Sequence, residues 1–293
     1  MKTRNIIAST ACFEIHNDLA ASHPMTYAEN IAQAERYLTL AGEAHSDIML
    51  LPEVFAIKGL AEWFTSDIAH DLAKLAESVP DGKSLRLVRK YARKYDMNVI
   101  APILELDCGA LFNTAVVIDR QGEVIGKYRK THLPDSEVVF TTPGDCLPVF
   151  KLDFGVIGVS TCYDLLFVEV CRTLALKGAE VVFWPTMWSS PAAEEGFSEL
   201  LMRGTALSNC VFMVSANYAK SEYDPTFRAG QSALISPLGE VLASTGFAPG
   251  FVSAELRLEN REATGEGGAT SCQYKIRRDE IRIRRRPELY NME

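Results

Sequence analysis

The chain lacks the features that mark membrane, zinc-binding and disulfide-rich proteins. No apolar run approaches the roughly 18 residues needed to span a bilayer, and Met1–His16 has no long apolar core followed by a small-residue cleavage site. The seven cysteines form no CxxC pair and no regular framework, so neither a zinc site nor a disulfide scaffold is indicated. We therefore expect a cytoplasmic protein without a metal or other cofactor.

An excess of positive charge is also missing. Thirty Lys and Arg residues face thirty-eight Asp and Glu residues, for a formal net charge of −8. This balance argues against general attraction to nucleic acid or to an anionic membrane, and it makes small molecules the expected partners. The charged tail at 274–293 has acidic residues among its basic ones, which favours an arm that contacts a partner subunit over a segment that binds nucleic acid.

Apolar β-forming runs alternate with helical patterns along most of the chain, which predicts an α/β protein. Thr26 and Glu29 form a capping box before the first helix. The first elements follow the order βαβαβ: Ile6–Ile15, Tyr27–Glu43, Asp47–Leu51, Lys83–Tyr95 and Asn98–Leu104. A second alternating series comprises Val156–Thr161, Phe167–Lys177, Val181–Trp184, Glu194–Ser208 and Cys210–Ala216.

Two predicted hairpins resemble each other. Thr114–Asp119 with Glu123–Tyr128, and Ser232–Ser236 with Glu240–Ala243, both have an apolar strand, a Gly turn and a returning "GEV". We expect two similar halves whose mixed sheets pack face to face, giving a four-layer α-β-β-α sandwich. One domain is expected over residues 1–260. A C-terminal extension over 261–293 is expected to contact another subunit.

Three residues that could perform acyl transfer each follow the end of a predicted strand. Cys162 follows "GVIGVST" at a strand-to-helix elbow, where backbone N–H groups and a helix N-terminus favour a thiolate. Glu53 follows "DIMLLP", where burial would raise its pKa and make it a proton acceptor. Lys130 in "GKYRKTHLP" could reach into a cleft as a fixed positive charge.

Each of these signals has an ordinary structural alternative. Cys162 could be a buried thiol at a strand end, Glu53 a solvated loop residue, and Lys130 part of a charged strand edge. Taken together, a carboxylate, an ammonium group and a thiol are the components that acyl transfer requires: a base, an oxyanion stabiliser and a nucleophile.

The segments "LPEVF", "GKYRKTHLP" and "GVSTCYDLLFVE" resemble, in this order, the three signature blocks of the nitrilase superfamily of carbon–nitrogen hydrolases. The resemblance extends over most of the chain through "RGTALSNCVFMVSAN", "GQSALISPLGEVLAS" and "RRPELY". It implies Glu53 as general base, Lys130 as oxyanion stabiliser and Cys162 as nucleophile. Glu137 would be a second glutamate that orients the substrate. The resemblance also implies the four-layer sandwich and a homodimer or larger homo-oligomer.

Differences from the family pattern narrow the expected chemistry. Many amidase-like members have Arg where this chain has Leu166 and Pro where it has Val168, whereas "CYD" is typical of the amide or carbamoyl branch. Hydrolases of carbamoyl amino acids commonly have arginines just after the cysteine that hold the substrate carboxylate, and this chain has Leu165 and Leu166 there. An amide is therefore the favoured substrate.

We therefore expect a small amide to be hydrolysed through a thioester to a carboxylic acid and ammonia or an amine. The backbone N–H of Tyr163 is expected to bind the oxyanion, and Thr186, Met187 and Trp188 to line the pocket. N-carbamoyl amine hydrolysis, nitrile hydrolysis, transfer to an acceptor other than water and non-catalytic binding are the alternatives.

Overall fold

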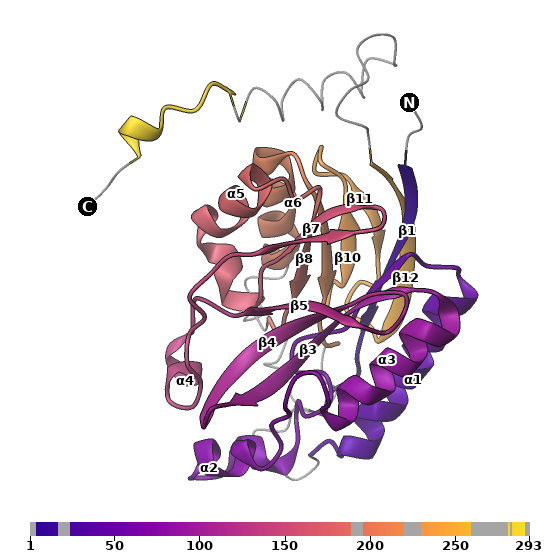
Figure 1. Ribbon diagram of the computed structural model, residues 1–293, viewed down its shortest axis with the longest axis vertical. Coiled ribbons are helices and arrows are strands. Elements are labelled where there is room, and N and C mark those ends of the chain that lie inside the picture. The colour runs from indigo at the N-terminus through magenta and orange to yellow at the C-terminus, as the bar shows by residue number, and fades with distance from the viewer. Residues whose placement is uncertain are drawn as a thin grey trace.

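The chain forms two six-stranded mixed sheets (Figure 1). The computed structural model describes residues 4–16, 24–188, 196–219, 230–258, 281 and 283–290. Most of the C-terminal extension expected over 261–293 lies outside these residues. The boundary between the two expected regions therefore stays a prediction.

The two sheets have the same internal order. In the first, β1, β2 and β3 run parallel, β4 and β5 follow as an antiparallel hairpin, and β12 pairs antiparallel with β1. In the second, β7, β8 and β9 run parallel, β10 and β11 form the hairpin, and β6 pairs antiparallel with β7. The strands of the first sheet are β1 (Arg4–Cys12), β2 (Ile48–Leu50), β3 (Asn98–Asp107), β4 (Ala110–Ile118), β5 (Val124–Arg129) and β12 (Gly250–Leu258). Those of the second are β6 (Val149–Leu152), β7 (Gly155–Val159), β8 (Val181–Pro185), β9 (Phe212–Ala216), β10 (Ala233–Ile235) and β11 (Val241–Ser244).

Helices cover the outer face of each sheet. In Figure 1, α1 and α3 lie on one side of the molecule and α5 and α6 on the other, with the sheets between them. The first helix begins at the predicted capping box, in which Thr26 and Glu29 bond each other's backbone N–H. The helices are α1 (Tyr27–Glu43), α2 (Ile68–Ala73), α3 (Lys83–Tyr95), α4 (Asp135–Val138), α5 (Val168–Leu176) and α6 (Phe197–Asn209). Ala61–Phe64, Cys162–Leu166 and Pro287–Leu289 are 3₁₀ turns.

Alternation along the strands separates the hydrophobic layers. In β2, Ile48 and Leu50 face the second sheet, whereas Met49, on the opposite face, packs in the cluster beneath α1 and α3. A third cluster lies between the second sheet and the helices α5 and α6. The predicted α-β-β-α sandwich is therefore confirmed, including the likeness of its halves.

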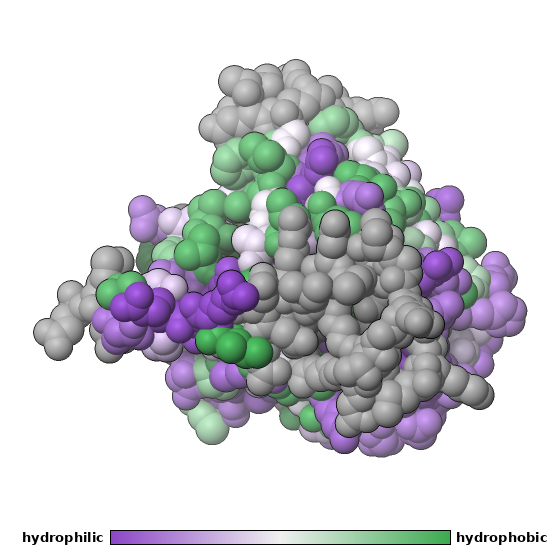
Figure 2. Space-filling view, turned by 90° about the horizontal axis from the view of Figure 1, so that it is seen from above, coloured by the Kyte–Doolittle hydropathy of each residue, from purple (hydrophilic) through white to green (hydrophobic). Residues whose placement is uncertain are grey.

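The surface carries hydrophilic and hydrophobic residues side by side. Figure 2 shows the hydrophilic segment 283–290 projecting at the left of the molecule. Residues from this segment, together with α5 and α6, line a cavity of about 720 Å³. Within the described ranges, no helix combines the length and the apolar character that crossing a membrane requires.

The core between the sheets should dominate stability. Replacing the fully buried Leu50 by Ala removes methyl groups from a close-packed layer and should lower the free energy of unfolding by about 2–5 kcal/mol. Leu242→Ala, at a side chain that is 40% exposed, is the matched control and should cost roughly 1 kcal/mol or less. Urea denaturation measures both changes, and equal losses would contradict the assignment of Leu50 to the core.

Candidate functional site

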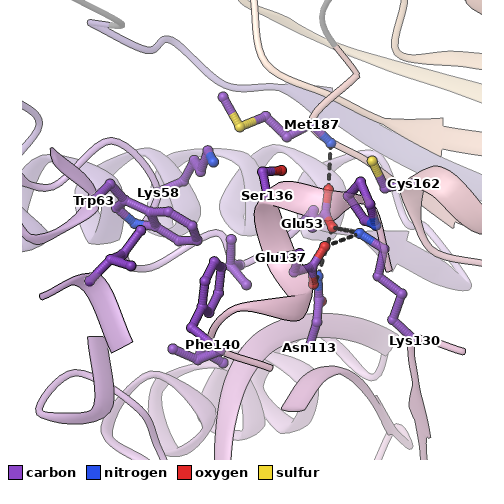
Figure 3. A pocket seen from close by; sticks show the side chains of 14 residues that line it. Glu53, Lys58, Trp63, Asn113, Lys130, Ser136, Glu137, Phe140, Cys162 and Met187 are labelled. Carbon is purple, nitrogen blue, oxygen red and sulfur yellow. Dashed lines mark hydrogen bonds and ion pairs between the residues drawn. The ribbon is translucent and has the colours of Figure 1, made fainter. Parts of the chain in front are cut away.

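A cavity of about 360 Å³ opens where β2, β5 and β7 end (Figure 3). Polar side chains cluster on one side of it: Glu53, Asn113, Lys130, Glu137 and Cys162. Its other walls are largely apolar and include Trp63, Ile68, Leu104, Phe140 and Met187. Three residues widely separated in the sequence, Glu53, Lys130 and Cys162, therefore meet at one pocket.

Glu53 stands just beyond β2 with its carboxylate fully hydrogen-bonded. Oε1 accepts from Lys130 Nζ at 3.0 Å and Asn113 Nδ2 at 2.7 Å, and Oε2 accepts from the backbone N–H of Met187 at 2.7 Å. The next residue, Val54, has a φ of +46°, which is an outlier for a β-branched residue. This left-handed step turns the chain sharply away from the strand and leaves the Glu53 carboxylate facing the pocket.

Lys130 is the buried centre of the cluster. It follows β5, its side chain is 1% exposed, and its ammonium group donates to both Glu53 and Glu137. Asn113 on β4 completes the arrangement, because its Nδ2 also donates to Glu137 Oε1 at 2.8 Å. The backbone carbonyl of Asn113 also accepts a hydrogen bond from the backbone N–H of Lys130 at 2.9 Å. The two carboxyl groups are thus joined through one cation and one amide.

Cys162 follows β7 in a strained backbone conformation. Its φ of +47° is uncommon outside glycine and places about 1–3 kcal/mol of strain at this residue. Its carbonyl accepts a hydrogen bond from Trp184 Nε1 at 2.9 Å. The helix predicted over Phe167–Lys177 is α5 (Val168–Leu176), and a 3₁₀ turn over Cys162–Leu166 separates it from the strand. The dipole of α5 therefore does not act directly on the sulfur.

Asp164 ties the cysteine turn to the segment that carries Lys130. This fully buried carboxylate accepts hydrogen bonds from the hydroxyls of Tyr128 and Thr131, at 2.6 and 2.9 Å, and from the backbone N–H groups of His132 and Thr161, each at 2.9 Å. Buried carboxylates are stable only when bonded in this way. The network fixes the positions of Lys130 and Cys162 relative to each other.

The thiol of Cys162 is protonated near neutral pH. Burial raises its pKa to about 12, the charge of Glu53 adds to this effect, and Lys130 opposes it. The sequence analysis expected an environment that favours the thiolate, and that expectation is wrong because desolvation outweighs the nearby ammonium group. Attack by this sulfur therefore requires removal of its proton by a base.

The pKa values of the two carboxyl groups are shifted in opposite directions. Burial opposes ionisation of Glu53, but the charge of Lys130 and the bonds from Lys130 and Asn113 hold the pKa of Glu53 below its usual range. Burial and the charge of Glu53 raise the pKa of Glu137. The expected rise in the pKa of Glu53 is thus wrong, because the sequence could not show its contact with Lys130. Glu53 is therefore the stronger acid of the pair.

Of the three residues expected to line the pocket, the structure places Met187 there. Thr186 and Trp188 are absent from the lining; Trp188 instead stacks on Phe197 in the helix-side cluster. Thr186 is buried, and its side chain lowers the pKa of the Cys162 thiol, so it lies beside the cysteine without lining the cavity. Tyr163 lies at the start of the 3₁₀ turn, where N–H groups have no acceptor within the helix.

The sequence analysis did not identify Asn113 or Lys58 as site residues. Asn113 lies on the same face of β4 as Ala115 and Val117, which point toward the second sheet. A polar residue on that apolar face could have indicated a site residue. Lys58 lies in an irregular turn, and its sequence context gave no comparable indication. Among the described residues, no cluster of three or more His, Cys, Asp and Glu side chains has an arrangement that could hold a metal ion.

Comparisons with known proteins agree with this architecture. The sequence model of the family described as "Carbon-nitrogen hydrolase" matches residues 19–266. An omega-amidase of Xenopus laevis, NIT2-A, is 31% identical over 90% of this chain and 92% of its own length. An N-carbamoylputrescine amidase of Arabidopsis thaliana is 28% identical over 83% of both chains.

The fold is also that of a solved structure. A variant of the Nesterenkonia AN1 amidase from the nitrilase superfamily superposes with a TM-score of 0.75 at 19% identity, covering 99% of this chain and 97% of that chain. The family match over residues 19–266 and the omega-amidase relative show that the chain belongs to the carbon–nitrogen hydrolases, as an amidase-like member.

Proposed function

We propose that the protein hydrolyses a small amide through a thioester on Cys162. The observation that carries this proposal is the convergence of an ionised Glu53, a buried Lys130 and a strained cysteine at one pocket. The printed name of the Xenopus relative, an omega-amidase, supports an amide as the substrate class. The pocket volume of about 360 Å³ suits a small molecule.

The first half of the reaction forms the acyl-enzyme. Cys162 Sγ attacks the amide carbonyl carbon while its proton passes to Glu53, and the carbonyl π electrons move onto oxygen. Lys130 and the backbone N–H of Tyr163 stabilise this oxyanion. The oxyanion that forms beside Lys130 competes with Glu53 for the ammonium group of Lys130. Glu53 therefore becomes a stronger base as the C–S bond forms. The C–N bond then breaks, and the nitrogen leaves with the proton from Glu53.

The second half returns the enzyme to its starting state. Glu53 takes a proton from water as the water oxygen attacks the thioester carbon, and the C–S bond breaks to release a carboxylic acid. The thiol recovers its proton from Glu53. Glu137, held by Lys130 and Asn113, keeps the ammonium group in place and faces the nitrogen end of the substrate.

The Arabidopsis relative, an N-carbamoylputrescine amidase, supports a carbamoyl amine as the second candidate, because the same two half-reactions would cleave its C–N bond. Assembly into a homodimer through the C-terminal extension stays a prediction. It agrees with the cavity that residues of 281–290 form with α5 and α6, where Val168 is 74% exposed.

Removing the sulfur should abolish turnover. Cys162→Ala cannot form a thioester, so ammonia release from a panel of amides, carbamoyl amines and nitriles should fall at least about 10⁴-fold while circular dichroism stays unchanged. Cys108→Ala, at an exposed cysteine, is the control and should behave as the wild type. Normal amide hydrolysis by Cys162→Ala would refute the assignment, and a wild type that is inactive on every compound would favour a binding protein.

Removing the base should slow catalysis without preventing substrate binding. Glu53→Gln keeps the size of the side chain but cannot accept the thiol proton, so kcat should fall by about 10²–10⁴-fold. The control is Glu255→Gln at an exposed position on β12, which should leave kcat unchanged. Steady-state kinetics measure both. A value of kcat for Glu53→Gln within a factor of two of the wild type would exclude Glu53 as the base.

A further inference from the structure

Thr186 is a buried threonine whose hydroxyl the fold does not use. The residue is 0% exposed, and within the described ranges its Oγ1 makes no hydrogen bond. Buried polar groups normally have a partner, because a hydroxyl without one loses its bonds to water and gains none in return. The idle hydroxyl of Thr186 therefore needs a reason, and its position beside the nucleophile supplies one.

The end of β8 that carries Thr186 faces the turn that holds Cys162. Strands β7 and β8 are parallel neighbours, and Trp184 Nε1 on β8 donates to the carbonyl of Cys162 at 2.9 Å. The backbone N–H of Thr186 bonds the carbonyl of Ala216 at 2.9 Å, which continues the ladder between β8 and β9. Side chains two residues apart on a strand share a face. Thr186 therefore points to the same side of the sheet as Trp184, toward the cysteine.

The hydroxyl of Thr186 acts on the sulfur of Cys162. Burial raises the pKa of the Cys162 thiol to about 12, and the hydroxyl of Thr186 is one of the groups that oppose this rise. A hydrogen bond lowers the pKa of a thiol when the bond to the thiolate is the stronger one. A neutral thiol is a weak acceptor, whereas a charged acceptor forms strong hydrogen bonds. The hydroxyl thus lacks a good partner while the thiol is protonated and gains one when the proton leaves.

The cation of the site is engaged elsewhere. Lys130 donates to both Glu53 and Glu137, and in the proposed mechanism it stabilises the oxyanion of the substrate. The sulfur therefore requires a donor of its own when it carries the negative charge. The next residue after Thr186 holds the other partner of the proton transfer, because the backbone N–H of Met187 bonds Glu53 Oε2 at 2.7 Å. One short segment thus reaches both the base and the nucleophile.

We propose that Thr186 is a catalytic residue whose hydroxyl donates a hydrogen bond to the Cys162 thiolate. This inference rests on the proposed function, in which Cys162 is the nucleophile. When the S–H bond breaks, the proton passes to Glu53, the electron pair stays on sulfur, and Thr186 keeps its own proton. When the C–S bond of the thioester breaks, the same hydrogen bond stabilises the departing thiolate. A bond that is strong only in these charged states accelerates the reaction without tightening substrate binding.

Steady-state kinetics of two Thr186 variants test the role of the hydroxyl. Thr186→Val replaces the hydroxyl by a methyl group, so kcat should fall roughly 10- to 100-fold, the range expected for one charge-assisted hydrogen bond. KM should change by less than about twofold, because the hydroxyl does not contact the substrate. Thr186→Ser keeps the hydroxyl and should keep most of kcat. A merely structural role would give the opposite order, since serine leaves a buried gap and valine does not.

Alkylation of Cys162 tests the thiolate without any amide. The probe is 2-iodoethanol, which has no carbonyl group: the thiolate forms a C–S bond to its carbon and iodide leaves. Mass spectrometry of the Cys162 peptide should show that Thr186→Val slows this reaction roughly 3- to 10-fold near neutral pH. The effect is smaller than that on kcat because a thiolate of higher pKa is also more nucleophilic. The exposed Cys108 is the internal reference. Thr10→Val is the matched control, because Thr10 is equally buried but donates to the carbonyl of Ser215 at 2.7 Å.

The two measurements separate failure of this inference from failure of the proposed function. Slower alkylation in Thr186→Val, with Thr186→Ser and the Thr10→Val control near the wild type, would support the hydrogen bond even if no amide were cleaved. Equal alkylation rates in the wild type and Thr186→Val would overturn it, as would a larger loss of kcat in Thr186→Ser than in Thr186→Val. The charged groups that also act on the sulfur, Glu53, Lys130 and Glu137, are the same in every variant compared.

Discussion

The site depends on the burial of one ammonium group between two carboxyl groups. Lys130 is almost inaccessible to solvent, and a charge in such a position is stable only with partners of opposite sign. Glu53 and Glu137 supply them, and Asn113 bonds both. The same contact explains why Glu53 is ionised although it is buried, and it leaves Cys162 with a base rather than with a pre-formed negative charge. The chemistry of the pocket follows from this arrangement of charges.

Much of the fold could be predicted from the sequence because periodicity reports local burial. The helices Tyr27–Glu43 and Lys83–Tyr95 have the predicted bounds, since each has an apolar face and a clear end. The strands β6 and β12 were not predicted. Both are edge strands, and β12 carries charged Glu255 and Arg257 on its exposed face, so neither has the apolar composition of the central strands. Which strands become neighbours is a property of the whole sheet and has no local signal.

The sequence predicted which residues meet at the site but not the directions of their pKa shifts. Glu53, Lys130, Glu137 and Cys162 lie in segments that resemble family signatures, and the structure brings them to one pocket. The pKa directions of Glu53 and Cys162 were wrong because each depends on distances between groups from different strands. Lys58 was overlooked for a related reason: a lysine in an irregular turn resembles any surface lysine until the position of Trp63 is known.

The pairing of β12 with β1 also constrains how the chain can fold. Arg4 lies opposite Leu258 and Cys12 opposite Gly250, so the first sheet joins the two ends of the described domain. During synthesis, one edge of β1 stays unpaired until residues 250–258 have been made. Contacts of such large sequence separation slow folding, and an exposed strand edge is vulnerable to aggregation in the meantime. The sheet that carries Glu53 and Lys130 is therefore completed only when β12, about 240 residues after β1, has been made and has paired with it.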